Sequence, residues 1–303
     1  MTTPAMMSGF PPAPERQVTL ANWRTPPFSR WAFQHVREIL PTAEIACDPA
    51  APRDLPEAPA DLGWFGVDGM GLDAFLAATD TDGIVVLRDG RIVLERYAHG
   101  MSARTPHILM SVSKSMLGIL AGILVARGVL DLDEDATRLV PEIAGSAWRG
   151  ARLRHLLDMR AGILFDENYL ATSGAIIRYR KAQGWNPLDP GEAPTDLRGF
   201  FATLDEADGA HGGRFHYVSP NTDLLGWIIE RATGERYADL ASRLLWRPMG
   251  AADPAYITVD RLGAPRCAGG FCATTRDLAR VGLLLAEGGR RDGREVVPAR
   301  WIE

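Results

Sequence analysis

The clearest alternating pattern lies between positions 81 and 100, in the segment TDGIVVLRDGRIVLERYAHG. Two runs rich in β-branched residues flank Asp89 and Gly90, a dipeptide that favours the tight type I′ turn of a β-hairpin. The pattern therefore predicts two antiparallel strands joined at that turn. No other segment gives an equally clear strand signal, so we expect an α/β body whose remainder is mostly helical.

Apolar residues recur at helical spacing in four further segments. The first is apolar on nearly every side and stops at Gly128, which predicts a helix buried in the core. The last has Thr274 or Thr275 as its N-cap and Gly288 after its end. The predicted spans are 109–128, 153–159, 221–234 and 274–289.

The chain divides by composition into an arm and a body. Residues 1–62 are rich in proline and alanine, with a short helical pattern from about Arg30 to Ile39, and predict an extended N-terminal arm. Residues 63–303 form the predicted domain, with a helical and loop insertion at about 130–215. That insertion contains a long aperiodic stretch, and a connection of such length in a compact body is usually functional or disordered.

Composition excludes several classes of protein. The chain has 303 residues, 46% of them hydrophobic, and its net charge of −5 argues against nucleic acid as a partner. Three cysteines make no disulfide framework, and the Cys-x4-Cys pair lacks the partners of a zinc site. The N-terminus has no secretory pattern, and the longest apolar run, 116–126, is too short for a membrane span. We expect a soluble cytoplasmic protein without cofactor or metal; its oligomeric state is not predicted.

The segment LMSVSKSMLG at the start of the predicted core helix carries candidate chemistry. Lys114 and Lys181 are the only lysines among 33 basic residues, and a lysine in an apolar setting can lose its proton. Ser111 stands three residues before Lys114 and so shares its helical face, whereas Ser113 is rotated away. Lys114 could therefore act as the base that activates Ser111 as a nucleophile. The alternative is a helix cap followed by a lysine that reaches to solvent.

A second segment, YVSPNTDLLGW, places Tyr217 and Ser219 directly before a predicted helix. A tyrosine at a helix entry is usually a core aromatic, but a phenol beside a lysine can also relay protons. Together, the Ser-x-x-Lys and Tyr-x-Ser motifs resemble those of the serine hydrolase superfamily of class C β-lactamases, penicillin-binding proteins and related esterases. Three features resemble the branch of 6-aminohexanoate-dimer hydrolases and carboxylesterases. They are the Tyr-x-Ser form of the second motif and the segments NWRTPPFSRWAFQHV and TTRDLARVG.

The resemblance runs from about residue 18 to the last residue and carries several expectations. It implies Ser111 as acylated nucleophile, Lys114 as base, Tyr217 as proton donor to the leaving group, and Ser219 as support for that network. It also implies a β-lactamase/transpeptidase-like fold, with an antiparallel sheet flanked by helices and an added helical region. The implied substrates are short linear amides or carboxylic esters.

The same resemblance implies substrate contacts, but one of the family's motifs is missing from the sequence. Tyr169 and Trp185 lie in segments where the family has substrate-covering loops, although both could be packing aromatics. The family's third motif, a Lys-Thr-Gly or His-x-Gly strand that supplies the second oxyanion donor, has no counterpart in the sequence. We therefore expect a C-terminally truncated chain of this family, with the C-terminal strands missing, a hairpin short of strand partners, and weak or no activity.

Other functions remain as alternatives. The six histidines form no His-Glu-x-x-His motif, which disfavours a metal hydrolase, and Gly-x-Ser-x-Gly is absent, which disfavours an α/β-hydrolase. The segment GMGLDA follows no convincing strand and is a weak candidate for a dinucleotide loop. The strongest alternative is a catalytically inactive member of the family that binds a ligand, or a non-functional fragment.

Overall fold

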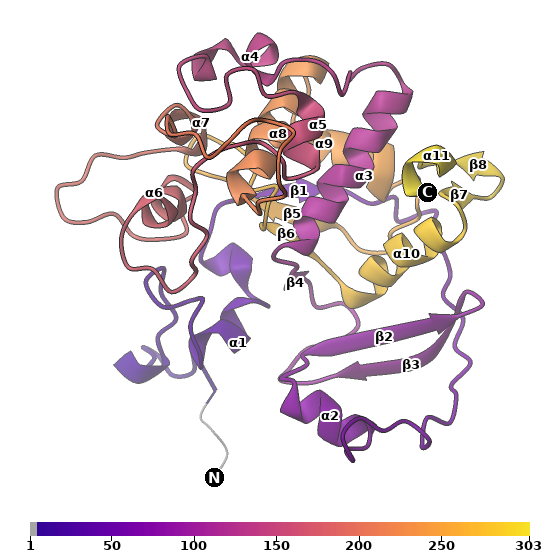
Figure 1. The fold of residues 1–303 in the computed structure, drawn as a ribbon. Coiled ribbons are helices and arrows are strands. Elements are labelled where there is room, and N and C mark those ends of the chain that lie inside the picture. Colours follow the sequence, from indigo (N-terminus) through magenta and orange to yellow (C-terminus); the bar gives the residue numbers. More distant parts are fainter. Residues whose placement is uncertain (1–4) are drawn as a thin grey trace.

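A computed structural model describes residues 5–303 of the chain (Figure 1). The strands are β1 (Thr42–Ile45), β2 (Gly83–Arg88), β3 (Arg91–Tyr97), β4 (His107–Ile108), β5 (Ala255–Thr258), β6 (Phe271–Ala273), β7 (Arg290–Arg291) and β8 (Arg294–Glu295). The α-helices are α1 (Phe28–Ala32), α2 (Leu72–Ala78), α3 (Val112–Ala126), α4 (Ala136–Leu139), α5 (Leu153–Leu157), α6 (Ala175–Ala182), α7 (Leu197–Phe201), α8 (Ser219–Thr233), α9 (Tyr237–Ala241), α10 (Thr275–Ala286) and α11 (Ala299–Ile302).

A four-stranded antiparallel sheet joins segments from distant parts of the chain. Its strands follow the order β1-β5-β6-β4, with Thr42 opposite Thr258 at one edge and His107 opposite Ala273 at the other. This sheet is built from segments that gave no clear strand signal in the sequence. Two of these four strands have two or three residues, too few to produce a visible alternation, and β5 is buried at all four positions.

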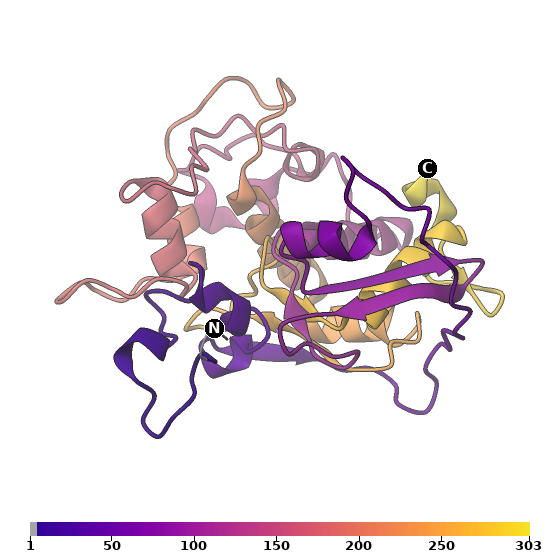
Figure 2. The same cartoon turned by 90° about the horizontal axis from the view of Figure 1, so that it is seen from below.

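The predicted hairpin is present as a separate two-stranded sheet. Asp89 and Gly90 both have positive φ, as the type I′ turn requires. As expected, β2 and β3 pair with each other rather than with a further strand, apart from one bridge between Glu57 and Ile92. The hairpin lies between α10 and α2 (Figures 1 and 2). These helices leave Val86 as its one large apolar side chain that is more than a third exposed.

The central helix α3 is buried along most of its length, as its apolar sequence predicts. It packs against α8, whose end at Gly234 has the left-handed conformation typical of a helix C-terminus. Helices α4, α5 and α7 come from the part of the sequence between the two predicted motifs, and all three pack against α8 (Figure 1). On its other side α3 contacts α11, where the Trp301 indole donates a hydrogen bond of 3.0 Å to the Gly118 carbonyl.

The N-terminal segment is bound closely to the rest of the chain. It supplies β1 to the sheet and places Trp23, 1% exposed, in a core cluster with Trp185. The Trp23 indole donates to the Trp185 carbonyl at 3.1 Å, across 162 positions of sequence. Its predicted short helix consists of α1 followed by a 3₁₀ turn at Val36–Glu38. The domain boundary at residue 62 stays a prediction.

Candidate active site

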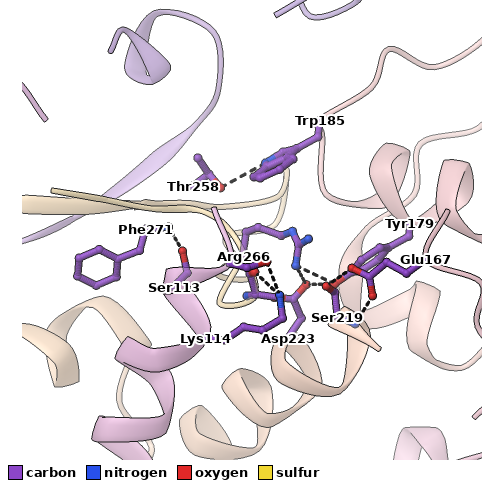
Figure 3. Close-up of polar contacts among 12 residues, drawn as sticks. Ser113, Lys114, Glu167, Tyr179, Trp185, Ser219, Asp223, Thr258, Arg266 and Phe271 are labelled. Carbon is purple, nitrogen blue, oxygen red and sulfur yellow. Dashed lines mark hydrogen bonds and ion pairs between the residues drawn. The ribbon is translucent and has the colours of Figure 1, made fainter. Parts of the chain in front are cut away.

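The candidate nucleophile stands where the chain turns from the sheet into α3. Ser111 is the N-cap residue of that helix, so its N–H precedes the helical hydrogen-bond ladder. The Ser111 residue is exposed to solvent. Met110 just before it has a φ of 45°, a left-handed conformation that costs energy for a residue with a side chain. In the same turn the buried Ser113 hydroxyl accepts a hydrogen bond of 3.0 Å from the Phe271 N–H of β6 (Figure 3). The sheet therefore fixes the start of α3 through Ser113 and leaves Ser111 free to face the solvent.

The structure brings Lys114 and Tyr217 to Ser111. The Lys114 ammonium nitrogen lies 3.1 Å from the Ser111 Oγ, and the Tyr217 hydroxyl lies 2.8 Å from it. The same Lys114 nitrogen is 4.8 Å from the centroid of the Tyr217 ring. Ser111 is the N-cap of α3, Lys114 lies in its first turn, and Tyr217 comes from the segment directly before α8. We call Ser111, Lys114 and Tyr217 the Ser111 cluster.

Lys114 is set apart from an ordinary surface lysine by its surroundings. Burial, followed by the nearby positive charge of Arg266, lowers the pKa of Lys114 to about 8, against the weaker opposing influence of Glu167 and Asp223. Its nitrogen donates a hydrogen bond of 2.7 Å to the Ala268 carbonyl, a neutral acceptor. Roughly one-tenth of Lys114 is therefore uncharged at pH 7 and can accept a proton from Ser111.

A buried ion pair supports the loop that carries Ala268. Asp223 on α8 is 2% exposed and accepts hydrogen bonds from the Ala268 N–H at 2.7 Å, from Arg266 Nη1 at 2.5 Å and from the Tyr179 hydroxyl (Figure 3). Burial raises the pKa of Asp223, whereas its pairing with Arg266 opposes that rise. Because Asp223 holds the N–H of Ala268 and Lys114 binds the carbonyl of the same residue, this ion pair fixes the acceptor that orients Lys114.

Ser219 makes a different contact from the one that the resemblance implies. Its N–H donates to Glu167 Oε2 at 2.7 Å and its hydroxyl donates to Glu167 Oε1, so the carboxylate caps the start of α8. The Tyr169 hydroxyl donates to the same carboxylate at 3.0 Å. Among the described residues, the Ser219 side chain makes no hydrogen bond to the Ser111 cluster. Its support of that cluster stays a prediction.

A cavity of about 610 Å³ opens beside Ser111, and both predicted substrate contacts line it. Tyr169 is 61% exposed, so a bound substrate can reach it. Trp185 is 5% exposed, packs edge-on against Trp23 at 5.0 Å between ring centroids, and donates to Thr258 at 3.3 Å. The packing role considered for Trp185 is thus present in the structure, and substrate contact by either residue stays a prediction.

The sequence analysis missed the residues that support Lys114. Asp223 had a detectable signal, because it is an acidic residue inside a predicted helix directly before the apolar run LLGWII, and a buried acid requires partners. Arg266, Ala268 and Glu167 gave no comparable signal, since they lie in loops and meet Asp223 or α8 only through the tertiary fold. In residues 5–303 no group of three or more His, Cys, Asp or Glu side chains is arranged to hold a metal ion. None of the described helices is long and apolar enough to cross a membrane.

Comparison with known proteins gives consistent matches. The β-lactamase family model matches residues 72–300. The chain is 38% identical over 295 residues to the 6-aminohexanoate-dimer hydrolase of Paenarthrobacter ureafaciens, covering 97% of this chain and 74% of that protein. It is 28% identical over 189 residues to esterase EstB of Burkholderia gladioli, covering 58% and 47%. A solved Bacillus anthracis structure, provisionally named a 6-aminohexanoate-dimer hydrolase, superimposes with a TM-score of 0.88 at 26% identity, covering 95% of this chain and 76% of that one.

Proposed function

This chain belongs to the β-lactamase family, and from that premise we propose that it hydrolyses short linear amides or carboxylic esters through a covalent acyl-enzyme on Ser111. The family and the antiparallel sheet with flanking helices that the sequence predicts are confirmed. The reaction, its residues and its substrate are the proposal. The convergence of the Lys114 nitrogen and the Tyr217 hydroxyl on one serine oxygen, at 3.1 and 2.8 Å, is the observation that carries it.

The proposed acylation uses all three side chains of the Ser111 cluster. Uncharged Lys114 accepts the hydroxyl proton of Ser111 as the Oγ attacks the substrate carbonyl carbon, and a tetrahedral oxyanion forms. The Ser111 N–H, which precedes the helical ladder, is the donor available to that oxyanion. Tyr217 delivers a proton to the departing amine or alcohol and recovers one from Lys114. The bond from carbonyl carbon to leaving group breaks, and the acyl group remains on Ser111.

Deacylation uses the same groups in reverse. A water molecule attacks the acyl carbonyl and gives its proton to the Lys114 and Tyr217 pair. The bond between the carbonyl carbon and Ser111 Oγ then breaks, and the serine oxygen takes that proton back. One amide or ester and one water thus yield one carboxylic acid and one amine or alcohol, and the Ser111 cluster returns to its starting state.

The relatives and the cavity support the substrate class. One relative is named for hydrolysis of the 6-aminohexanoate dimer and another is named an esterase, so linear amides and simple esters are the natural first candidates. Phe33 and Ile176 contribute apolar surface to the cavity beside Ser111, which suits a short methylene chain. The cytoplasmic location stays a prediction from the sequence.

Covalent labelling tests the proposal directly. A serine-reactive fluorophosphonate should add one adduct to the intact chain, and peptide mass spectrometry should place it on Ser111. The Ser111→Ala variant should take up no label, and its matched control Ser115→Ala, which alters an exposed serine in the same turn, should label normally. An unlabelled Ser111 in the folded chain would instead favour the inactive binding protein.

A further inference from the structure

Two arginines line the cavity beside Ser111 without an acidic partner. Arg24 comes from the N-terminal segment and Arg180 from α6, and both are partly buried. Within the described part of the chain, neither guanidinium has a carboxylate at ion-pair distance. Arg266 lines the same cavity but is paired with Asp223 at 2.5 Å, so it differs from the other two in having a carboxylate partner. Because burying a charge is costly without a counter-charge, the absence of an acid beside these two partly buried arginines needs a reason.

Both guanidiniums are held in place and keep free donors. The Arg24 guanidinium carbon lies 5.6 and 6.0 Å from the ring centroids of Trp23 and Trp185, and Arg24 Nη2 donates to the Asn186 side chain. Arg180 Nη2 donates to the Tyr169 carbonyl at 3.0 Å. The Arg24 Nε is buried and makes no hydrogen bond in residues 5–303. A guanidinium has five N–H donors, so most of the donors of each make no hydrogen bond to the described residues.

A third polar group in the cavity is also without a partner. Gln183, one turn after Arg180, lines the cavity and is 2% exposed. Neither its side-chain oxygen nor its side-chain nitrogen has a hydrogen-bond partner in the described structure. Burying an amide in this state is unfavourable, and a polar ligand in the cavity would satisfy it.

The charges around the cavity favour an anion. Burial, followed by repulsion from Arg180 and Arg266, lowers the pKa of Arg24 to about 10. Glu167 is the one carboxylate among the described lining residues, and Ser219 and Tyr169 already donate to it. A ligand carboxylate would relieve the repulsion between the guanidiniums and could accept paired hydrogen bonds from either one.

We propose that Arg24 and Arg180, assisted by Gln183, bind a carboxylate of the substrate that lies several bonds from the carbonyl attacked by Ser111. This inference rests on the proposed function and narrows its substrate class to short amides or esters that also carry a carboxylate. The carboxylate belongs either to the acyl group or to the leaving group, and the two positions are distinguished by the choice of test compound.

Matched substrates test the inference. For the acyl side, mono-4-nitrophenyl adipate is compared with methyl 4-nitrophenyl adipate, which differs by one neutralised carboxylate. For the leaving-group side, N-butanoyl-6-aminohexanoate is compared with its methyl ester. In at least one pair, kcat/KM should be about tenfold or more in favour of the anion, the effect expected from one charge-assisted hydrogen bond. Equal values in both pairs would overturn the inference and leave the proposed function standing.

Variants assign the preference to the arginines. Arg180→Gln and Arg24→Gln should each reduce the ratio of anionic to neutral kcat/KM about tenfold. Arg178→Gln is the matched control, because Arg178 lies on the same helix as Arg180 but is exposed and outside the cavity. An equal reduction of the ratio by Arg178→Gln would mean that general surface charge, and not this pair, produces the preference.

A binding measurement keeps the test independent of catalysis. Titration calorimetry on the Ser111→Ala variant should show adipate binding at least tenfold more tightly than adipamide, and Arg180→Gln in that background should remove the difference. If Ser111 is never labelled, the proposed function fails, yet adipate binding still tests the arginines. Adipate and adipamide binding equally, or neither binding, would refute the carboxylate site.

Discussion

The two lysines of the chain occupy contrasting environments. Lys114 at the start of α3 contacts the Ser111 hydroxyl and the Ala268 carbonyl, and its pKa is lowered to about 8. Lys181 near the end of α6 donates to Asp189 at 2.7 Å and to Glu192 at 2.5 Å, and these two hydrogen bonds raise its pKa. Lys114 therefore loses its proton more readily than an ordinary lysine, whereas Lys181 stays charged.

The difference teaches how the fold lowers the pKa of a lysine so that part of it is uncharged. Two carboxylates lie near Lys114, but each is already engaged, Asp223 by Arg266 and Glu167 by the start of α8. Lys114 is left with neutral oxygen acceptors, so the cost of burying its charge is only weakly compensated. Lys181 has the two carboxylates that Lys114 lacks. The pairing of Asp223 with Arg266 is therefore part of what keeps the pKa of Lys114 low.

The largest expected effect comes from removing the Ser111 hydroxyl, which Lys114 contacts. Ser111→Ala should lose hydrolysis of 4-nitrophenyl butyrate to below about one part in 10³, because no acyl-enzyme can form. The control is Ser113→Ala, two residues along the same helix. It should retain activity where it folds, although it leaves the Phe271 N–H unpaired and should lower the free energy of unfolding by about 1–3 kcal/mol. An active Ser111→Ala with an inactive, folded Ser113→Ala would reverse the assignment.

The comparison of the lysines is sharpest when both receive the same substitution. Lys114→Arg keeps the charge but removes a group that can release a proton near neutral pH, so kcat/KM should fall about 10²–10⁴-fold. Lys181→Arg preserves the ion pairs to Asp189 and Glu192 and should stay within about twofold of the unmodified chain. Steady-state kinetics on both variants measures the contrast. Retention of most of the rate by Lys114→Arg would make Lys114 an electrostatic partner and not a base.

The next test removes the pairing that frees Lys114. Asp223→Asn leaves Arg266 buried and uncompensated and weakens the hold on Ala268, so we expect about 3–5 kcal/mol less stability to urea and roughly 10–100-fold lower kcat/KM. The control Asp239→Asn changes an exposed carboxylate on α9 and should alter neither quantity appreciably. A stable, fully active Asp223→Asn would show that the ion pair does not orient Lys114.

The sequence predicted the local parts of this arrangement and missed the tertiary ones. The spacing of Ser111 and Lys114 is set by one turn of helix, and Asp89-Gly90 by one turn of hairpin, so both could be deduced from neighbours in sequence. Strand β4 has two residues, and its partner β6 lies more than 160 positions further along the chain. The contact between Arg266 and Asp223 likewise depends on a loop meeting α8. Neither leaves a periodic trace in the sequence.

The smallest expected effect is a pH dependence, and it distinguishes the two lysine environments without any substitution. The base must be uncharged, and with a pKa of about 8 roughly one-tenth of Lys114 is uncharged at pH 7 and roughly nine-tenths at pH 9. We therefore expect kcat/KM to rise about tenfold between these values, along a limb centred near pH 8. Lys181 cannot produce such a limb, since its pKa is raised above the range of the assay.

Stability moves in the same direction, so the folded fraction is measured at each pH to separate unfolding from the titration of the base. A lysine with a folded-state pKa of about 8 and an unfolded value of about 10.4 binds fewer protons when folded between these limits. The contribution of Lys114 to the free energy of unfolding thus increases as the pH rises through that window. The profile is measured with initial rates corrected for spontaneous ester hydrolysis, and the residual activity of Lys114→Arg should lack the limb. A flat profile in the unmodified chain, or the same limb in Lys114→Arg, would show that another group supplies the base.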